Sequence, residues 1–140
     1  MSVMEWDPAL ALGMEQMDAT HREFVEHLNR LDAAADAEML AAFDAFYAHT
    51  VAHFEQEAEW MRSLAFPMIH CHEAEHNGVL GVMREVRGHL EAGKFHVAHV
   101  LATEMASWFR GHAATMDAML ASYMKLKVAG CVSQPSIAGS

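Results

Sequence analysis

The chain has 140 residues, of which 53 % are hydrophobic and 20 % are charged, and its formal net charge at pH 7 is −10. This length and composition suit a single globular domain with a substantial core. The acidic balance excludes nucleic acid and an anionic membrane surface as expected partners, since both require clustered Lys and Arg. No apolar run approaches the roughly 18–20 residues of a spanning helix, so we expect no membrane insertion.

Two features of the sequence bear on its location in the cell. The N-terminal stretch MSVMEWDPALALGMEQ carries acidic residues and no basic segment, so it is not expected to be a signal peptide. The two cysteines, Cys71 and Cys131, do not suggest a disulfide framework. We therefore expect a cytoplasmic protein.

Residues that favour helix dominate the chain, and four helices are predicted after an irregular leader, residues 1–17. Trp6 and Leu10 of the leader are expected to pack across the end of the bundle. The helices are predicted to run from Asp18, a candidate N-cap, to Ala34, from Asp36 to Leu64, from Pro67 to Gly93, and from Phe95 to Lys127. Their short connections predict an all-α, up-down-up-down antiparallel four-helix bundle over residues 1–127. Residues 128–140 are expected to form a disordered tail.

Histidines and acidic residues interrupt the apolar face of every predicted helix. At three-and-four spacing these core-facing polar residues are His21, His53, Glu57, His72, His76 and His112. In the fourth helix the same spacing continues through Met116, Met119 and Tyr123, which leaves Asp117 one step beyond the core face. The seven polar groups, Asp117 included, are expected at a similar level of the bundle. Because buried polar groups need partners, we interpret this layer as a metal site.

The spacing within the fourth helix raises a geometric problem. His112 and Asp117 are five residues apart, which separates them by about 140° on a regular helix. Either one side chain reaches sideways or the helix is distorted there, and Gly111 would permit a distortion. The full set of five imidazoles and two carboxylates is too large for one ion. It suits two borderline cations such as iron or manganese.

Two other metal sites are weaker interpretations of the same residues. His72-Glu73-Ala74-Glu75-His76 matches the H-E-x-x-H pattern of zinc proteases, but Val79 and Val82 occupy the places where the longer metzincin pattern has Gly and His. That interpretation also leaves His21, His53 and His112 unexplained. A ferritin-like di-iron site needs two Glu-x-x-His motifs and is rich in carboxylates, whereas this sequence has one such motif and a set rich in histidine.

The motifs and their order resemble those of hemerythrin, specifically the bacterial hemerythrin-like proteins, from Trp6 to Tyr123. The motifs are D-x-x-H at Asp18–His21, H-F-x-x-E at His53–Glu57, H-x-x-x-H at His72–His76, and W-F-x-x-H-x-x-x-x-D at Trp108–Asp117. The resemblance implies two iron ions bridged by an oxo or hydroxo group. By motif position, one ion would be held by His72, His76 and His112. The other would be held by His21 and His53, and Glu57 and Asp117 would bridge the pair.

The resemblance also implies a function. The histidines, the two bridging carboxylates and the bridging oxygen would fill all but one of the positions around two six-coordinate irons. O2 would bind reversibly as peroxide at the open position, on the iron with two histidines. No protein acid or base is needed, so we expect an oxygen-binding protein for storage, transport or delivery, with an oxygen-consuming enzyme as a partner, rather than an enzyme. Phe24, Leu28, Trp108, Phe109 and Met116 are candidates to shield that position.

Two alternatives remain open for a protein of this kind. One is a sensing module, in which O2 or the redox state alters packing and signals to a partner. The other is di-iron chemistry on peroxide or nitric oxide. The remaining histidines, which are His27, His49, His70, His89, His96 and His99, show no ligand pattern and are interpreted as surface or interface groups. Cys71 is expected to be a packed thiol that does not bind metal.

Overall fold

The computed structural model describes the backbone of residues 2–133 and the side chains of residues 2–127. A 3-10 turn, η1 (Pro8–Leu10), precedes helix α1 (Glu15–Ala33), and a second, η2 (Asp36–Glu38), leads into α2 (Met39–Ser63). Helix α3 spans Ile69–Glu91. Helix α4 (His96–His112) passes through a π-helical turn, η3 (Ala113–Asp117), directly into α5 (Ala118–Ser133). The described residues contain no strand, which confirms the predicted all-α class.

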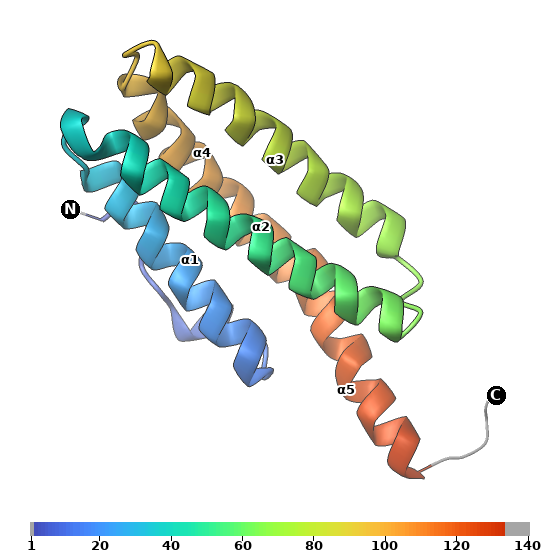
Figure 1. The fold of residues 1–140 in the computed structure, drawn as a ribbon. Helices are drawn as coiled ribbons and strands as arrows, with labels where there is room; N and C mark the ends of the chain where they lie inside the picture. Colours follow the sequence, from blue (N-terminus) through green and yellow to red (C-terminus); the bar gives the residue numbers. More distant parts are fainter. Residues whose placement is uncertain (1, 134–140) are drawn as a thin grey trace.

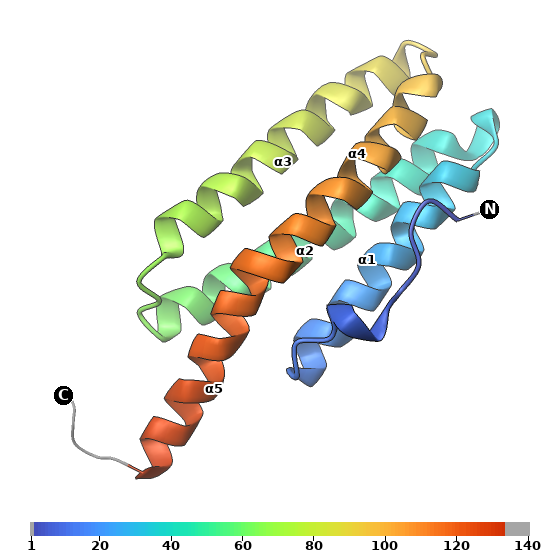
Figure 2. The ribbon, with the colours of Figure 1, turned by 180° about the vertical axis from the view of Figure 1, so that it is seen from behind.

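The helices form an antiparallel four-helix bundle in which α4, η3 and α5 together make the fourth member (Figure 1). Helix α1 packs against α2 and α4, and α3 packs against the same two helices from the other side. Helix α5 extends beyond the ends of its neighbours in both ribbon views (Figures 1 and 2). None of the helices within residues 2–133 is both long and apolar enough to cross a membrane. The predicted bundle is confirmed.

The boundaries of all four helices differ from those predicted. Helix α2 begins at Met39, after η2, rather than at Asp36. Helix α1 begins at Glu15, three residues before the expected N-cap Asp18, and α3 begins at Ile69, after Pro67 rather than at it. The backbone of α5 continues to Ser133, past the predicted end of the fourth helix. The rest of the expected tail, residues 134–140, lies outside the described residues.

Asp18 connects the leader to α1 instead of capping the helix. Its carboxylate is 6 % exposed and accepts hydrogen bonds from the backbone N–H groups of Leu12, at 2.8 Å, and Gly13, at 3.1 Å. Gly13 has a φ of 79°, a left-handed conformation that glycine adopts without strain. The chain therefore reverses at Gly13 and enters α1 with its turn held by a buried carboxylate.

The leader runs alongside α1 rather than across the end of the bundle, so this expectation was wrong (Figure 2). Asn29, near the far end of α1, accepts hydrogen bonds from the backbone N–H groups of Val3 and Met4. Met4 is buried in the main core, and Trp6 and Leu10 pack half-buried against it. Two side chains of α1, Asn29 and Asp18, thus bind the two ends of the leader and fix its path.

Two hydrophobic clusters fill the interior, one on each side of the polar layer. The larger cluster includes Phe24, Phe46, Met83 and Phe109. The smaller one contains Met17, Met61, Phe66, Leu120, Ala121 and Met124. Along each helix the predicted site residues fall between members of the two clusters, as His21 does between Met17 and Phe24. The polar layer is therefore closed by apolar packing above and below.

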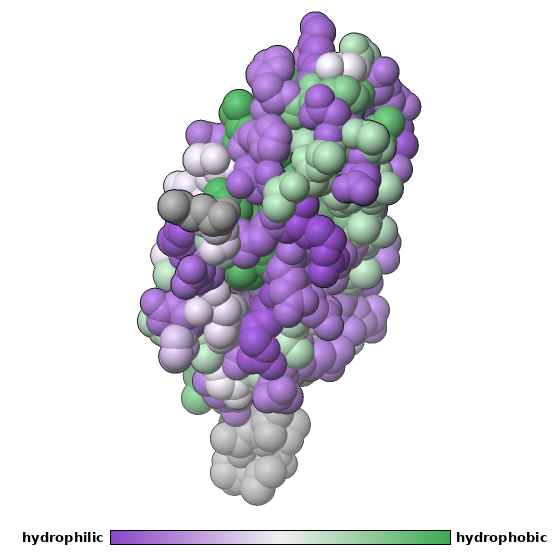
Figure 3. Space-filling view, turned by 90° about the vertical axis from the view of Figure 1, so that its left-hand side faces the viewer, coloured by the Kyte–Doolittle hydropathy of each residue, from purple (hydrophilic) through white to green (hydrophobic). Residues whose placement is uncertain are grey.

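The outer surface mixes residue types. On the face shown in Figure 3, hydrophilic side chains predominate and the hydrophobic areas between them are small.

Candidate metal centre

The structure brings all seven sequence-predicted site residues together in the interior. None of them is more than 5 % exposed. They form two overlapping groups of donors, in each of which the ligand atoms lie within 4.8 Å of one another. One group contains Glu57, His72, His76, His112 and Asp117, and the other contains His21, His53, Glu57 and Asp117. Both carboxylates thus belong to both groups.

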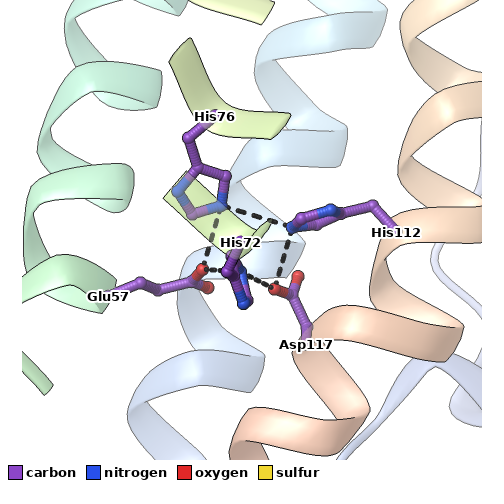
Figure 4. A group of neighbouring side chains, drawn as sticks. All are labelled: Glu57, His72, His76, His112 and Asp117. Atoms are coloured by element: carbon purple, nitrogen blue, oxygen red, sulfur yellow. Dashed lines mark hydrogen bonds and ion pairs between the residues drawn. The ribbon is translucent and has the colours of Figure 1, made fainter. Parts of the chain in front are cut away.

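The first group contains three histidines, and its side chains point toward a common centre (Figure 4). Nε2 of His72 lies 3.1 Å from Oε1 of Glu57 and 3.1 Å from Oδ1 of Asp117. Nε2 of His76 lies 3.3 Å from the same oxygen of Glu57, and Nε2 of His112 lies 3.1 Å from the same oxygen of Asp117. The two carboxylates therefore present one oxygen each, Oε1 and Oδ1, to the three imidazoles.

The second group contains two histidines and uses the other oxygen of each carboxylate. Nε2 of His53 lies 2.9 Å from Oε2 of Glu57. Nε2 of His21 lies 3.1 Å from Oδ2 of Asp117 and 3.7 Å from Oε2 of Glu57. Glu57 and Asp117 thus stand between the two sets of histidines, and each turns one oxygen to either side. This is the arrangement of two carboxylates that can bridge a pair of cations.

Several of these close approaches are not hydrogen bonds, which supports the fit to metal. Both carboxylate oxygens of Asp117 and both ring nitrogens of His21 are buried without a hydrogen-bond partner. Buried polar groups are normally satisfied, so donors that converge without bonding one another need a further partner. Neutral imidazole nitrogens and carboxylate oxygens are ligands that borderline divalent cations accept. The buried His, Glu and Asp cluster therefore fits a metal site.

The π-helical turn η3 explains how His112 and Asp117 face the same centre. The N–H of Ala118 donates to the carbonyl of Ala113, five residues earlier, which is the hydrogen-bond spacing of a π-helix. The wider turn puts residues five apart on one face, so the expected distortion is present. The distortion does not depend on a glycine at position 111, because a Cβ added to Gly111 would meet no atom within 4 Å.

The same turn moves the core face of the helix by one residue. Met119 is 51 % exposed and Tyr123 is half-buried, so these predicted core residues were assigned wrongly, and Met116 is also only half-buried. The buried positions are instead Asp117, Leu120 and Met124, each one residue later. A pattern counted at regular helical spacing cannot follow the face through a turn with an extra residue.

Burial and charge compete in setting the pKa values of these side chains. Burial opposes protonation of His21 and His72, but the nearby carboxylates of Asp117 and Glu57 outweigh it and raise the pKa of each imidazole from 6.5 to about 9. Burial likewise opposes ionisation of Glu57, yet the surrounding imidazoles hold its pKa well below the usual value. Burial lowers the pKa of His76. These shifts favour an ionised Glu57 beside protonated His21 and His72.

Glu75 is a polar neighbour of the cluster that the sequence analysis did not assign. Its Oε1 accepts a hydrogen bond from Nε1 of Trp108 at 3.1 Å and lies 3.0 Å from Nδ1 of His112. The Trp108 ring stacks on that of His112, with centroids 4.4 Å apart. The carboxylate and indole together fix the orientation of this imidazole. Its position three residues after His72, on the α4 side of α3, becomes evident only once the helices are packed.

The residues proposed to shield an open position lie in different places. The Phe109 ring meets the His21 ring edge-on at 5.0 Å and stacks on Phe24 at 4.6 Å. These two phenylalanines cover the group with two histidines. Trp108 instead lies beside His112, in the group with three. Leu28 is buried in the larger cluster, whereas Met116 is only half-buried.

The protease-like motif has no catalytic glutamate in the centre. Glu73 points away from the cluster, 4.0 Å from Arg62 in a surface pair. Cys71 is exposed, which corrects the expectation of a packed thiol. Only His72 and His76 of the H-E-x-x-H segment enter the buried cluster.

A helical bundle with this buried layer of five imidazoles and two carboxylates defines a four-helix metal-binding protein. The family model described as the Hemerythrin HHE cation binding domain matches residues 12–124. The chain belongs to the hemerythrin family.

Curated relatives and solved structures agree with this assignment. Over 124 residues the chain is 40 % identical to a bacteriohemerythrin of Ralstonia nicotianae (strain ATCC BAA-1114 / GMI1000), covering 89 % of this chain and 90 % of the relative. It is 27 % identical to a bacteriohemerythrin of Stenotrophomonas maltophilia (strain R551-3), covering 89 % and 84 % respectively. A crystal structure of wild-type hemerythrin superposes with a TM-score of 0.79 at 22 % identity, covering 85 % of this chain and 95 % of that chain.

Proposed function

We propose that this protein binds O2 reversibly at a pair of iron ions held by His21, His53, Glu57, His72, His76, His112 and Asp117. The observation that carries the proposal is the asymmetry of the two donor groups. Three histidines lie on one side of the shared carboxylates and two lie on the other. If iron were held by these residues, the side of His21 and His53 would offer one histidine fewer than the other side and would leave the position for O2 there. When bound, the irons would supply the electrons for reversible O2 binding.

The protein side chains have three tasks in this proposal. Glu57 and Asp117 would hold both ions, because each carboxylate turns one oxygen to either set of histidines. The five imidazoles present Nε2 to the cluster, and Glu75 orients His112 through its other nitrogen. Phe24 and Phe109 pack over the side of His21 and keep water and protons away from the open position. Exclusion of water favours reversible binding over oxidation, so we infer a binding protein rather than an enzyme.

Metal analysis and optical spectroscopy test the proposal together. Iron-loaded, reduced protein should contain about two iron ions per chain and develop a visible band in air that disappears when O2 is removed. Repeated cycles without loss would support a carrier. Steady consumption of a reductant together with peroxide or nitric oxide would favour di-iron enzymology instead. Loss of the band with no recovery, or a content of about one zinc per chain, would contradict the proposal.

Matched variants test which ion carries the open position. His21→Ala and His53→Ala should abolish the O2-dependent band, since each removes a ligand on the two-histidine side. His76→Ala is the control variant, because it removes one of the three histidines that lie on the other side of the shared carboxylates. Normal O2 binding by both His21→Ala and His53→Ala would show that the open position is assigned to the wrong ion.

A further inference from the structure

Three polar side chains gather on the outside of the α1–α2 pair. Glu23 and His27 are four residues apart on α1, so they project from the same face of that helix. His49 lies opposite them on α2, with its Nε2 3.2 Å from Oε1 of Glu23. The ring centroids of His27 and His49 are 4.9 Å apart. Two imidazoles and a carboxylate thus meet across two packed helices, outside the seven-residue centre.

We propose that Glu23, His27 and His49 form a third metal site, which binds one divalent transition cation such as Zn²⁺ at the protein surface. Imidazole nitrogen and carboxylate oxygen are the ligands that zinc takes in proteins, and three protein ligands leave a fourth position for water. The packing of α1 against α2 already fixes the Cα positions of these three residues. Binding requires the half-buried His27 and the exposed Glu23 side chains to rotate until their donor atoms and Nε2 of His49 face one cation.

The packing of His49 gives the site one preorganised ligand. The side chain of His49 is 14 % exposed, and its Nδ1 is buried without a hydrogen-bond partner. Its ring also contacts that of His53, with centroids 6.2 Å apart. The ring is therefore fixed against the bundle, and Nε2 is the nitrogen directed at Glu23 and the surface. A ligand fixed before binding loses less conformational entropy when the cation arrives.

Charges of both signs lie near the proposed ligands. The guanidinium of Arg30 has the largest electrostatic influence on His27 and opposes a cation there, whereas the carboxylates of Glu23 and Glu26 favour one. The negative charge of Glu23, itself a proposed ligand, would offset part of the charge of the bound cation. His49 is also four residues before His53 on α2, about 6 Å along the helix. The proposed site is close to the buried centre but shares no ligand with it.

Zinc titration of the full-length, iron-loaded protein tests this site, with a chromophoric chelator as competitor. The wild type should bind about one equivalent of zinc more than His27→Ala/His49→Ala, while the iron content stays unchanged. Glu23→Gln preserves the side-chain volume and should weaken zinc binding. Because the comparison is a difference between variants, it does not depend on what the buried cluster holds.

His99→Ala provides the matched control. His99 pairs with the carboxylate of Asp32 across two helices at 3.1 Å, as His49 does with Glu23, and lies elsewhere on the surface. This variant should bind zinc as the wild type does. A zinc-soaked crystal should show anomalous density beside His49 Nε2. Equal zinc binding by the wild type and the double variant, or an equal loss in His99→Ala, would overturn the proposal.

Discussion

Oε1 of Glu75 lies 3.0 Å from Nδ1 of His112, on the side of the imidazole that faces away from the buried cluster. The other ring nitrogen, Nε2, faces Asp117. A carboxylate at Nδ1 keeps the proton there and leaves the lone pair of Nε2 free for a metal. Trp108 donates to the same carboxylate oxygen and stacks on the ring, so the carboxylate is itself held in place.

Removal of this carboxylate should weaken the centre without removing a ligand. Glu75→Ala is expected to lower metal affinity by about 10–100-fold, because the tautomer and orientation of His112 are no longer fixed. Iron retained at increasing chelator concentration measures the effect. Glu73→Ala is the matched control, since it removes a glutamate of the same helix that pairs with Arg62 at the surface. Equal iron retention by the two variants would assign Glu75 no positioning role.

The π-helical turn makes an unusual deletion tolerable. If Ala114, which is exposed, is removed, Asp117 follows His112 by four residues instead of five. A regular helix would then place both on one face and keep Leu120 and Met124 in the core. We expect the deletion variant to remain folded, with helix content and metal binding preserved. Circular dichroism and metal analysis measure both.

Deletion of Thr103, an exposed residue in the regular part of α4, is the control for this experiment. It should rotate every later side chain by about 100° and carry His112 and Asp117 away from the centre. We expect that variant to lose metal binding and much of its stability. If the two deletions reduced metal binding and stability equally, η3 would contribute more than a change of helical register.

Periodicity predicted much of this structure because each metal-binding pair is local. His53 and Glu57, like His72 and His76, are four residues apart on one helix, so their spacing alone places them on one face. Antiparallel packing then brings those faces to one level. The positions after His112 could not be predicted in the same way. Nothing in the residue types of Ala113–Asp117 specifies hydrogen bonds five residues apart, so Met119 was placed inside and Leu120 was overlooked.

Contacts between distant segments were the other features that the sequence did not indicate. The role of Glu75 depends on how α3 faces α4, which brings it to Trp108 and His112. The path of the leader depends on hydrogen bonds from Val3 and Met4 to Asn29, more than twenty residues away. Helix propensity and spacing describe single segments, so they leave these pairings undetermined.

Phe109 should affect both stability and the proposed oxygen chemistry. It is 1 % exposed, stacks on Phe24 and meets His21 edge-on. Phe109→Ala is expected to lower the free energy of unfolding by about 3–5 kcal/mol through the cavity it creates. It should also admit water beside His21 and accelerate oxidation of the iron-loaded protein. Urea unfolding and the decay of the O2-dependent band measure the two effects.

Leu28→Ala separates these two effects. Leu28 is fully buried in the same hydrophobic cluster, about two helical turns from His21, and its truncation is expected to cost about 2–5 kcal/mol. The rate of oxidation should nevertheless remain that of the wild type. If Leu28→Ala accelerated oxidation as much as Phe109→Ala, the effect would reflect general loosening of the bundle rather than shielding of His21.

Asp18 offers a test of how the leader is bound to the bundle. Its buried carboxylate accepts from the N–H groups of Leu12 and Gly13, and Asp18→Ala leaves both donors without that partner. The free energy of unfolding should fall by about 1–3 kcal/mol, and amide exchange at these two residues should accelerate. Glu15→Ala, an exposed change in the same helical turn, should do neither.

Amide exchange at Val3 and Met4 should change less in Asp18→Ala, because Asn29 holds them separately. Uniform acceleration along the whole leader would instead show that it detaches as one unit.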